Sequence, residues 1–464
     1  MLYGDFRRSW PNSRKEFLVL GSAVDKSPLS LKNRAINGSI WSFVGFGSGQ
    51  FLRLASNLLL TRLLFPETFG ILALVQVILQ GIKMFSDVGI STSVVRDERG
   101  DQPAYLNTAW TLQLIRGALI WGVSGLLAYP ASKLYNAPEL LYLIPAIGFT
   151  ACIQGFNAPI ILTLKRHLKV RQLISWEVTT QVITIILTVI LAWQYQSVWA
   201  IAIGGILGAL CGCLASYLMS HELPRFHLEL SSLENIFSFG KWIFLSTALT
   251  FLIQQGDVLI LGAFLSKAQL GMFSIAVIWS RMVLQLVLKI NDQVMMPLYA
   301  EAYRGDKATI KGKIQRGRIP LLLITLPATW IMVICGQIFI ELLYDPRYYS
   351  AGWMLQILSV GTIGSVITAT AGTALLSFGD SFGFMLFQVS RAVLLVICMA
   401  IGGYYFNTLG LLAGVALSKI ISYPFLAVTL NKHNIWMPAV DLAAFTISIV
   451  VISIGLWVTN GMSV

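Results

Sequence analysis

The chain has 464 residues, of which 56% are hydrophobic and only 12% are charged. A soluble domain carries about 25% charged residues because its surface must be hydrated, so this composition excludes an ordinary soluble globular protein. The net charge is +12, and we interpret it as a sign of orientation in a membrane and of contact with anionic lipid rather than of nucleic-acid binding. The five cysteines lie inside apolar runs at spacings that predict neither a metal site nor a disulfide.

Long apolar runs alternate along the chain with short charged stretches. Each run could cross the bilayer core of about 30 Å as a helix of about 20 residues, and the runs are too long and too uniformly apolar for the strands of a membrane barrel. The sequence therefore predicts an all-α polytopic membrane protein. Its thirteen helices are predicted at 37–61, 69–91, 107–129, 139–160, 173–193, 198–219, 237–263, 270–298, 319–342, 351–377, 382–404, 408–429 and 438–459.

The distribution of Lys and Arg predicts the orientation, because cations in short loops favour the cytoplasmic side. With the N-terminus inside, the inner loops hold 21 cations, a count that includes Arg318 just before the ninth helix. The outer loops hold only four, namely Arg62, Lys133, Lys267 and Arg347. We therefore expect a multi-pass membrane protein with a cytoplasmic N-terminus.

Two internal similarities indicate a duplicated unit. The stretch LTRLLFPETFG (60–70) resembles LGAFLSKAQLG (261–271), and the tripeptide Arg-Gly-Asp occurs at 99–101 and again at 304–306. Both pairs fall at matching places in two sets of six helices, which predicts a parallel repeat about an axis along the membrane normal. The predicted organisation is a cytoplasmic tail (1–35), an N-lobe (36–219), a linker (220–236), a C-lobe (237–429) and an extra C-terminal hydrophobic segment (430–464).

Eight basic residues fall within or at the edge of the predicted helices. A cation at mid-bilayer costs at least about 2.5–3.5 kcal/mol, so such residues indicate a water-filled interior unless they reach the surface or form pairs. Lys83, Lys241 and Lys289 are close enough to helix ends to reach the surface. The five others are predicted to line a cavity: Arg53, Arg116, Arg281, Arg391 and Lys419. Among the acidic residues, Asp441 is expected at a helix end close to water.

Polar residues also recur at helical spacing and form stripes on four predicted helices. The stripes are Gln50, Arg53 and Asn57; Gln76, Gln80, Lys83 and Asp87; Ser246, Thr250, Gln254 and Asp257; and Arg281, Gln285, Lys289 and Asp292. Residues three and four apart share a helix face, so we expect these faces to line the space between the lobes; polar contacts that only hold helices together are the alternative. An interior with more cations than anions suits an anionic substrate, and arginine suits phosphate in particular.

Several longer stretches resemble one known family. They are LLTRLLFPETFGILALVQ (59–76), FSDVGISTSVVRDE (85–98), QQGDVLILGAFLSKAQLGMFSIA (254–276), VMMPLYAEAYRGD (294–306) and LQILSVGTIGSVITATAGTALLSFGD (355–380). The chain resembles, over about residues 30–430, the polysaccharide-transporter branch of the multidrug/oligosaccharidyl-lipid/polysaccharide exporter superfamily. Members of this branch are flippases of oligosaccharide repeat units and usually have twelve or fourteen helices, so thirteen is a departure.

The resemblance implies a fold and a function. The fold is two six-helix bundles related by a pseudo-two-fold axis, as in multidrug exporters. The function is translocation of undecaprenyl-diphosphate-linked oligosaccharide units across the bacterial inner membrane by alternating access, for O-antigen, capsule or exopolysaccharide synthesis. Membrane lipids, a polysaccharide polymerase and chain-length proteins are the further partners. No organic cofactor or metal is expected, and H⁺ or Na⁺ is the candidate coupling ion.

Residue roles follow from this reading. The residues expected to contact the anionic, lipid-linked oligosaccharide are Arg53, Arg116, Arg281, Arg391, Lys419, Gln50, Gln254 and Gln285. Those expected to couple ions or to pair with the cations are Asp87, Asp257 and Asp292.

Two other functions compete with this one. A multidrug or small-solute exporter of the same superfamily would prefer an acidic cavity, which the internal cations disfavour. A membrane enzyme would need a sizeable external loop or a catalytic group, and all four histidines fall in predicted cytoplasmic loops. There is also no Gly-Lys-Ser/Thr phosphate-binding motif. The sequence therefore predicts a transporter and not an enzyme.

Overall fold

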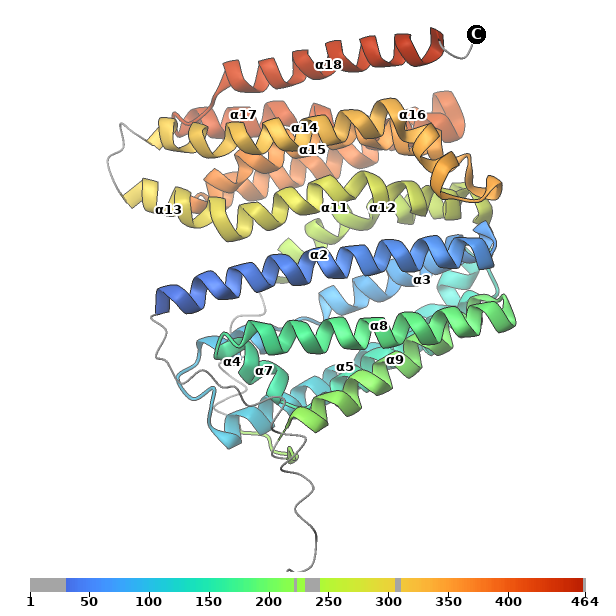
Figure 1. The fold of residues 1–464 in the computed structure, drawn as a ribbon, viewed down its shortest axis with the longest axis vertical. Coiled ribbons are helices and arrows are strands. Elements are labelled where there is room, and N and C mark those ends of the chain that lie inside the picture. The colour runs from blue at the N-terminus through green and yellow to red at the C-terminus, as the bar shows by residue number, and fades with distance from the viewer. Residues whose placement is uncertain (1–30, 221–222, 230–242, 305–309, 462–464) are drawn as a thin grey trace, which may run out of the picture.

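The computed structural model describes residues 31–220, 223–229, 243–304 and 310–461 (Figure 1), and these ranges contain helices and turns but no strand. The predicted tail as far as residue 30, most of the predicted linker, Lys241, His221 and Gly305-Asp306 lie outside them. The first set of helices is α2 (Leu31–Leu63), α3 (Pro66–Phe85), α4 (Ile90–Arg96), α5 (Pro103–Leu134), α6 (Leu140–Gly155), α7 (Ile160–Arg166), α8 (Val170–Tyr195) and α9 (Val198–Met219).

The second set begins after the linker. It comprises α11 (Ile243–Phe264), α12 (Lys267–Ile290), the π-helix η1 (Asn291–Met295), α13 (Met296–Arg304), α14 (Ile310–Leu343), the 3₁₀ turn η3 (Pro346–Tyr348), α15 (Ala351–Ser377), α16 (Ser381–Ile421), α17 (Tyr423–Lys432) and α18 (Pro438–Gly461). Figure 1 shows the two sets as two layers of roughly aligned helices, with α18 at the far edge of the second layer.

The helices confirm a multi-pass membrane protein. Within the described ranges, ten helices are long and apolar enough to cross a membrane, or eleven if the bent pair α6 and α7 counts as one span. Two predicted helices, 198–219 and 351–377, match α9 and α15 residue for residue. The more polar α2 is not among the ten, because its inner face carries the predicted polar stripe.

Helix breaks account for the larger differences from the predicted boundaries. The fourth predicted helix, 139–160, is divided by a bend of 68° between α6 and α7. The eighth, 270–298, runs from α12 through a π-helical turn into α13. The eleventh and twelfth meet in α16, where Asn407 has a φ of 51° and the chain turns back on itself. Gly402 and Gly410 then pack directly against each other, because a side chain on either would collide with the carbonyl of its partner.

The two lobes cross closely at one end of the molecule, through α3 and α12. A Cβ atom added to Gly70 would collide with the carbonyl of Lys267, and one added to Gly271 would collide with the carbonyl of Pro66. Gly70 and Gly271 are 201 residues apart, as are Pro66 and Lys267, so the two contacts exchange equivalent partners. Such reciprocity is the mark of a two-fold axis, and it supports the predicted duplication. We call this the sealed end, and the opposite end, which carries residues 223–229, the linker end.

The Arg-Gly-Asp tripeptide of the first lobe has a structural role at the linker end. Asp101 accepts hydrogen bonds from Arg166 at 2.9 Å and from His167 at 2.7 Å, and these bonds hold the pKa of the Asp101 carboxyl below its usual value against the opposing effect of partial burial. Arg166 also donates to the carbonyls of Val94 and Asp97 and so fastens the end of α4. Gly100 leaves room for the Arg166 guanidinium, which a side chain at this position would displace.

A buried ion pair fixes α18 to the second lobe, and here two predictions are wrong. Arg318 was counted as a loop cation and Asp441 was expected near water, but their side chains are 2% and 0% exposed and lie 2.5 Å apart. Arg318 also donates to Thr370 at 3.1 Å, and Tyr423 donates to Asp441 at 2.7 Å. α14 begins at residue 310, earlier than predicted, so Arg318 lies inside a helix.

We predict that breaking this pair on one side destabilises the protein more than removing it altogether. Arg318→Met alone leaves the Asp441 carboxylate buried without its cation, which typically costs about 3–5 kcal/mol, whereas replacing both charges with apolar groups is often neutral. Arg318→Met should therefore lower the thermal unfolding temperature of the detergent-solubilised protein, and Arg318→Met/Asp441→Leu should recover much of the loss. A double variant as unstable as the single one would contradict this account.

Candidate functional site

A cavity of about 660 Å³ lies between the two lobes. Its walls come chiefly from α2 and α3 of the first lobe and α12 of the second, with two residues each from α8 and α11 and one each from α6 and α9. The described residues that line it include three basic and no acidic side chains. The polar lining is Gln50, Arg53, Ser56, Asn57, Gln76, Gln80, Lys83, Gln181, Gln255, Ser274, Arg281 and Gln285.

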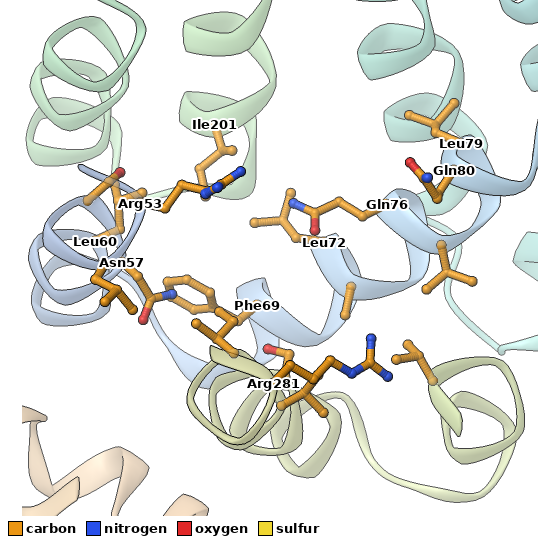
Figure 2. Close-up of a pocket in the computed structure, with 18 of the residues that line it drawn as sticks. Arg53, Asn57, Leu60, Phe69, Leu72, Gln76, Leu79, Gln80, Ile201 and Arg281 are labelled. Atoms are coloured by element: carbon orange, nitrogen blue, oxygen red, sulfur yellow. The ribbon is translucent and has the colours of Figure 1, made fainter. Parts of the chain in front are cut away.

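Arginines from different lobes face this cavity. Figure 2 shows Arg53 on α2 and Arg281 on α12 at its walls, with Gln76 and Gln80 projecting from α3. Arg53 donates from Nε to Gln50 at 3.0 Å, and Gln50 donates in turn to Gln285 of the other lobe. Gln285 lies one helical turn from Arg281. Two amides thus carry the hydrogen-bonded chain from Arg53 across the gap between the lobes, to the helical turn that follows Arg281.

Arg281 is partly neutralised from behind. Its Nη2 lies 2.5 Å from Oδ2 of Asp257, a carboxylate whose side chain is only 4% exposed and does not line the cavity. The other oxygen of Asp257 accepts the backbone N–H of Val258 at 2.9 Å. The Arg281 side chain is 25% exposed. Its guanidinium can therefore meet a ligand on the cavity side while its position is fixed by the buried acid.

Lys419 and Arg391 lie behind the same wall on α16. The Lys419 ammonium is near enough to the Asp257 carboxylate to be attracted by it, and near enough to Arg281 and Arg391 to be repelled by their guanidinium groups. Arg391 donates to Gln388 at 3.1 Å. Neither side chain lines the cavity. They add positive potential to the region of Arg281 without direct access to a ligand in this conformation.

In the first lobe, Arg116 is used to hold the end of α3. Its Nη2 donates to the carbonyl of Lys83 at 2.9 Å, its Nε donates to Ser86 at 3.3 Å, and Asp87 lies 3.8 Å from Nη1. These bonds occupy carbonyl and hydroxyl groups that a helix end would otherwise leave to water. Arg116 and Asp87 are outside the cavity lining, whereas Lys83 is part of it.

The predicted site residues thus separate into two groups by position. Arg53, Arg281, Gln50 and Gln285 line the cavity, and Gln254, Arg116, Arg391, Lys419, Asp87, Asp257 and Asp292 do not. The stripe on α11 does not share one environment, because Gln254 is exposed and Asp257 is buried, while the adjacent Gln255 reaches the cavity. Asp292 lies in the π-helix, where the spacing on which the α12 stripe was based no longer holds.

Some lining residues were not among the predicted contacts. Gln76, Gln80 and Asn57 belonged to predicted stripes but received no role, and Lys83 was interpreted as reaching the membrane surface. Gln181 of α8 donates to the carbonyl of Gly49 on α2 at 3.2 Å and also lines the cavity. It shares a helix face with Glu177, Thr184 and Thr188, at steps of four, three and four, so this polar periodicity could have identified it.

Comparison with known proteins connects this architecture to a family. The family profile described as "Polysaccharide biosynthesis protein" matches residues 59–352. The lipopolysaccharide biosynthesis protein WzxC of Escherichia coli K12 is 22% identical over 408 residues, which cover 85% of this chain and 80% of that protein. The succinoglycan biosynthesis transport protein ExoT of Rhizobium meliloti is 22% identical over 261 residues, covering 56% and 53%.

Two solved structures show the fold. The lipid II flippase MurJ, in an inward closed conformation, superposes with a TM-score of 0.64 at 12% identity, covering 90% of this chain and 98% of that one. An inward-facing multidrug resistance transporter of the MATE family and MOP superfamily superposes with a TM-score of 0.61 at 13% identity, covering 83% and 94%. The predicted pair of six-helix bundles with a MATE-like arrangement is confirmed.

We predict that the cavity contains water. In a variant whose five cysteines are replaced by alanine, Gln76→Cys should react readily with a water-soluble thiol reagent, because hydration permits the thiolate to form. Leu119→Cys is the matched control on α5, since Leu119 is 53% exposed but does not line the cavity and should meet lipid. Equal rates of labelling at the two positions, measured by mass spectrometry of protein in membranes, would contradict a hydrated cavity.

Proposed function

We propose, because the chain belongs to the polysaccharide biosynthesis protein family, that it is a flippase for undecaprenyl-diphosphate-linked oligosaccharide units. The observation that carries the proposal is the cavity between the lobes, whose described lining has three basic side chains and no acidic one. The cargo of such a flippase is a diphosphate with a sugar chain and a long lipid. Its phosphates need cations, its sugars need amides and hydroxyls, and its hydrocarbon can remain in the bilayer.

The cavity chemistry suits each polar part of this cargo. A guanidinium can bind two phosphate oxygens at once, and Arg53 and Arg281 approach from opposite lobes. The amide side chains beside them, Gln50, Gln76 and Gln285, offer both donors and acceptors for sugar hydroxyls. A cationic drug would be repelled by this lining, so the same observation disfavours a cation exporter.

Direction follows from the charge distribution. The sealed end carries the turns with few cations and the linker end carries those with many, so we assign the linker end to the cytoplasm. The cavity would then take its cargo from the cytoplasmic leaflet in this conformation. Release requires separation of the lobes at the sealed end. This sequence of states is alternating access between two related bundles.

Asp257 is our candidate for ion coupling. When a phosphate approaches Arg281, it competes with the Asp257 carboxylate for the same guanidinium. A carboxylate released from its partner in a poorly hydrated place favours the uptake of a proton or a sodium ion. Cargo binding and ion binding would thereby be linked through one arginine. Asp87 and Asp292 are less suited to this role, because both are exposed in this structure.

We predict that the two cavity arginines are required for transport. A hydrogen bond to a charged group contributes about 1.5–3 kcal/mol, so Arg53→Gln or Arg281→Gln should weaken cargo binding by about 10- to 100-fold. In a strain lacking the native gene, each variant should restore little surface polysaccharide although its level in the membrane is normal. Arg281→Lys should restore part of it, since the charge remains but the two-pronged geometry is lost.

Lys133→Gln is the matched control, because it removes an exposed cation that lies outside the cavity, over the ring of Tyr129. It should restore polysaccharide fully. Normal polysaccharide in both the Arg53→Gln and Arg281→Gln strains would refute the cavity assignment.

A further inference from the structure

The sealed end contains a second feature that occurs once in each lobe, at equivalent positions. α5 and α14 are equivalent helices, and each ends in Leu followed by Tyr: Leu134-Tyr135 and Leu343-Tyr344. In each lobe the short turn that follows the tyrosine reaches the opposite lobe. We call these turns 134–139 and 343–348.

The two tyrosines make equivalent contacts. Tyr135 donates to the carbonyl of Leu259 on α11 at 3.4 Å, and its ring fills the space beside Gly262. Tyr344 donates to the side-chain oxygen of Asn57 on α2 at 2.7 Å. Leu259 and Asn57 are 202 residues apart, nearly the 201 that separates Gly271 from Gly70. Each tyrosine therefore binds the first long helix of the other lobe at the same level.

The rest of each turn also reaches across. Glu139 lies 2.9 Å from Lys267, the first residue of α12. This hydrogen-bonded pairing holds the pKa of the Glu139 carboxyl below its usual value. On the other side, Tyr348 donates to the carbonyl of Leu64 at 2.8 Å and packs edge-on against Phe69 at a ring separation of 5.9 Å. Glu139 thus contacts the start of α12, just after the junction of α11 and α12, and Tyr348 contacts the equivalent junction of α2 and α3.

The two halves differ in strength. Tyr344 and Tyr348 are 4% and 0% exposed, and Arg347 adds a bond to the carbonyl of Arg62 at 3.2 Å. By contrast, the side chains of Glu139 and Lys267 are 46% and 31% exposed, and an exposed ion pair contributes little because water and salt screen it. The turn 343–348 should therefore account for most of the closure.

We propose that the turns 134–139 and 343–348 form a duplicated latch that keeps the cavity closed at the sealed end. The latch lies directly beside the cavity, because two residues that line the cavity also contact its tyrosines: Asn57 accepts the bond from Tyr344, and Phe69 packs against Tyr348. The hydroxyl of Tyr344 also accepts a bond from Trp279 of its own lobe at 2.8 Å, but the bonds to Asn57 and Leu64 cross between the lobes and must break when the lobes separate there. This inference concerns the opening of the molecule and does not depend on which cargo it carries.

The test measures access to the cavity from each end. Ser274 lines the cavity one turn from the crossing at Gly271, and Ser274→Cys in a cysteine-free variant gives a small reporter thiol. A membrane-impermeant thiol reagent is applied to right-side-out and to inside-out membrane vesicles, so that each end is probed separately. The reporter should react slowly from the sealed end.

Removing the two buried hydroxyls with Tyr344→Phe/Tyr348→Phe should raise the rate from the sealed end by about tenfold or more, since each lost hydrogen bond shifts the closed state by several-fold. Tyr135→Phe/Glu139→Gln should raise it less. Labelling from the linker end should stay the same or fall. Tyr404→Phe/Tyr405→Phe is the matched control, because these tyrosines on α16 are 83% and 70% exposed and lie outside both turns.

Unchanged labelling from the sealed end in Tyr344→Phe/Tyr348→Phe would overturn the latch. So would an equal rise from both ends, because that result indicates general loosening of the fold. A similar rise in Tyr404→Phe/Tyr405→Phe would overturn it as well.

Discussion

The structure depends on how charged groups are accommodated at membrane depth. A guanidinium in hydrocarbon is costly unless it has water or a counter-ion, and this chain uses both solutions. Arg318 is buried against Asp441 and binds α18 to its lobe. Arg53 and Arg281 instead border a cavity between the lobes. The first arrangement makes a fixed part of the bundle, and the second leaves guanidinium groups accessible to a ligand that enters the cavity.

The difference between these solutions separates framework from site. Arg318 joins α14 to α15 and α18, so it moves with the second lobe and α18 as a unit. Arg281 has a fixed acid on one side and the cavity on the other, so its interactions can change when a ligand arrives. Arg53 is linked to the opposite lobe through the amides of Gln50 and Gln285. Separation of the lobes would break that chain, and rearrangement of these contacts would accompany each transport cycle.

Much of the fold could be predicted from the sequence, because hydropathy reports directly on membrane burial. The duplication was visible in the stretch that holds Gly70 and Gly271, and the structure shows why those glycines recur: they let two helix backbones touch at the axis. The pairing of Arg318 with Asp441 was not predictable, since nothing local connects residues 123 positions apart. A charged helix start at 310–318 also resembles a loop when only composition is considered.

The site was less predictable than the fold, for geometric reasons. Helical spacing correctly placed Gln50, Arg53, Arg281 and Gln285 on faces that meet the cavity. It failed where the helix geometry changes, at the π-helix containing Asp292. It also failed where two neighbouring residues are both glutamine, because spacing could not show that Gln255 and not Gln254 faces the cavity. Arg116 and Lys419 have the residue type of a phosphate ligand, but spacing cannot show that neighbouring helices stand between them and the cavity.

The central claim is that the cavity binds a lipid diphosphate through arginines of both lobes, and native mass spectrometry of the detergent-solubilised protein tests it most directly. With undecaprenyl diphosphate carrying a short oligosaccharide as the probe, one bound lipid per protein should be retained, and binding should be largely lost in Arg53→Gln/Arg281→Gln. Undiminished binding in that variant, with the protein still folded, would contradict the account.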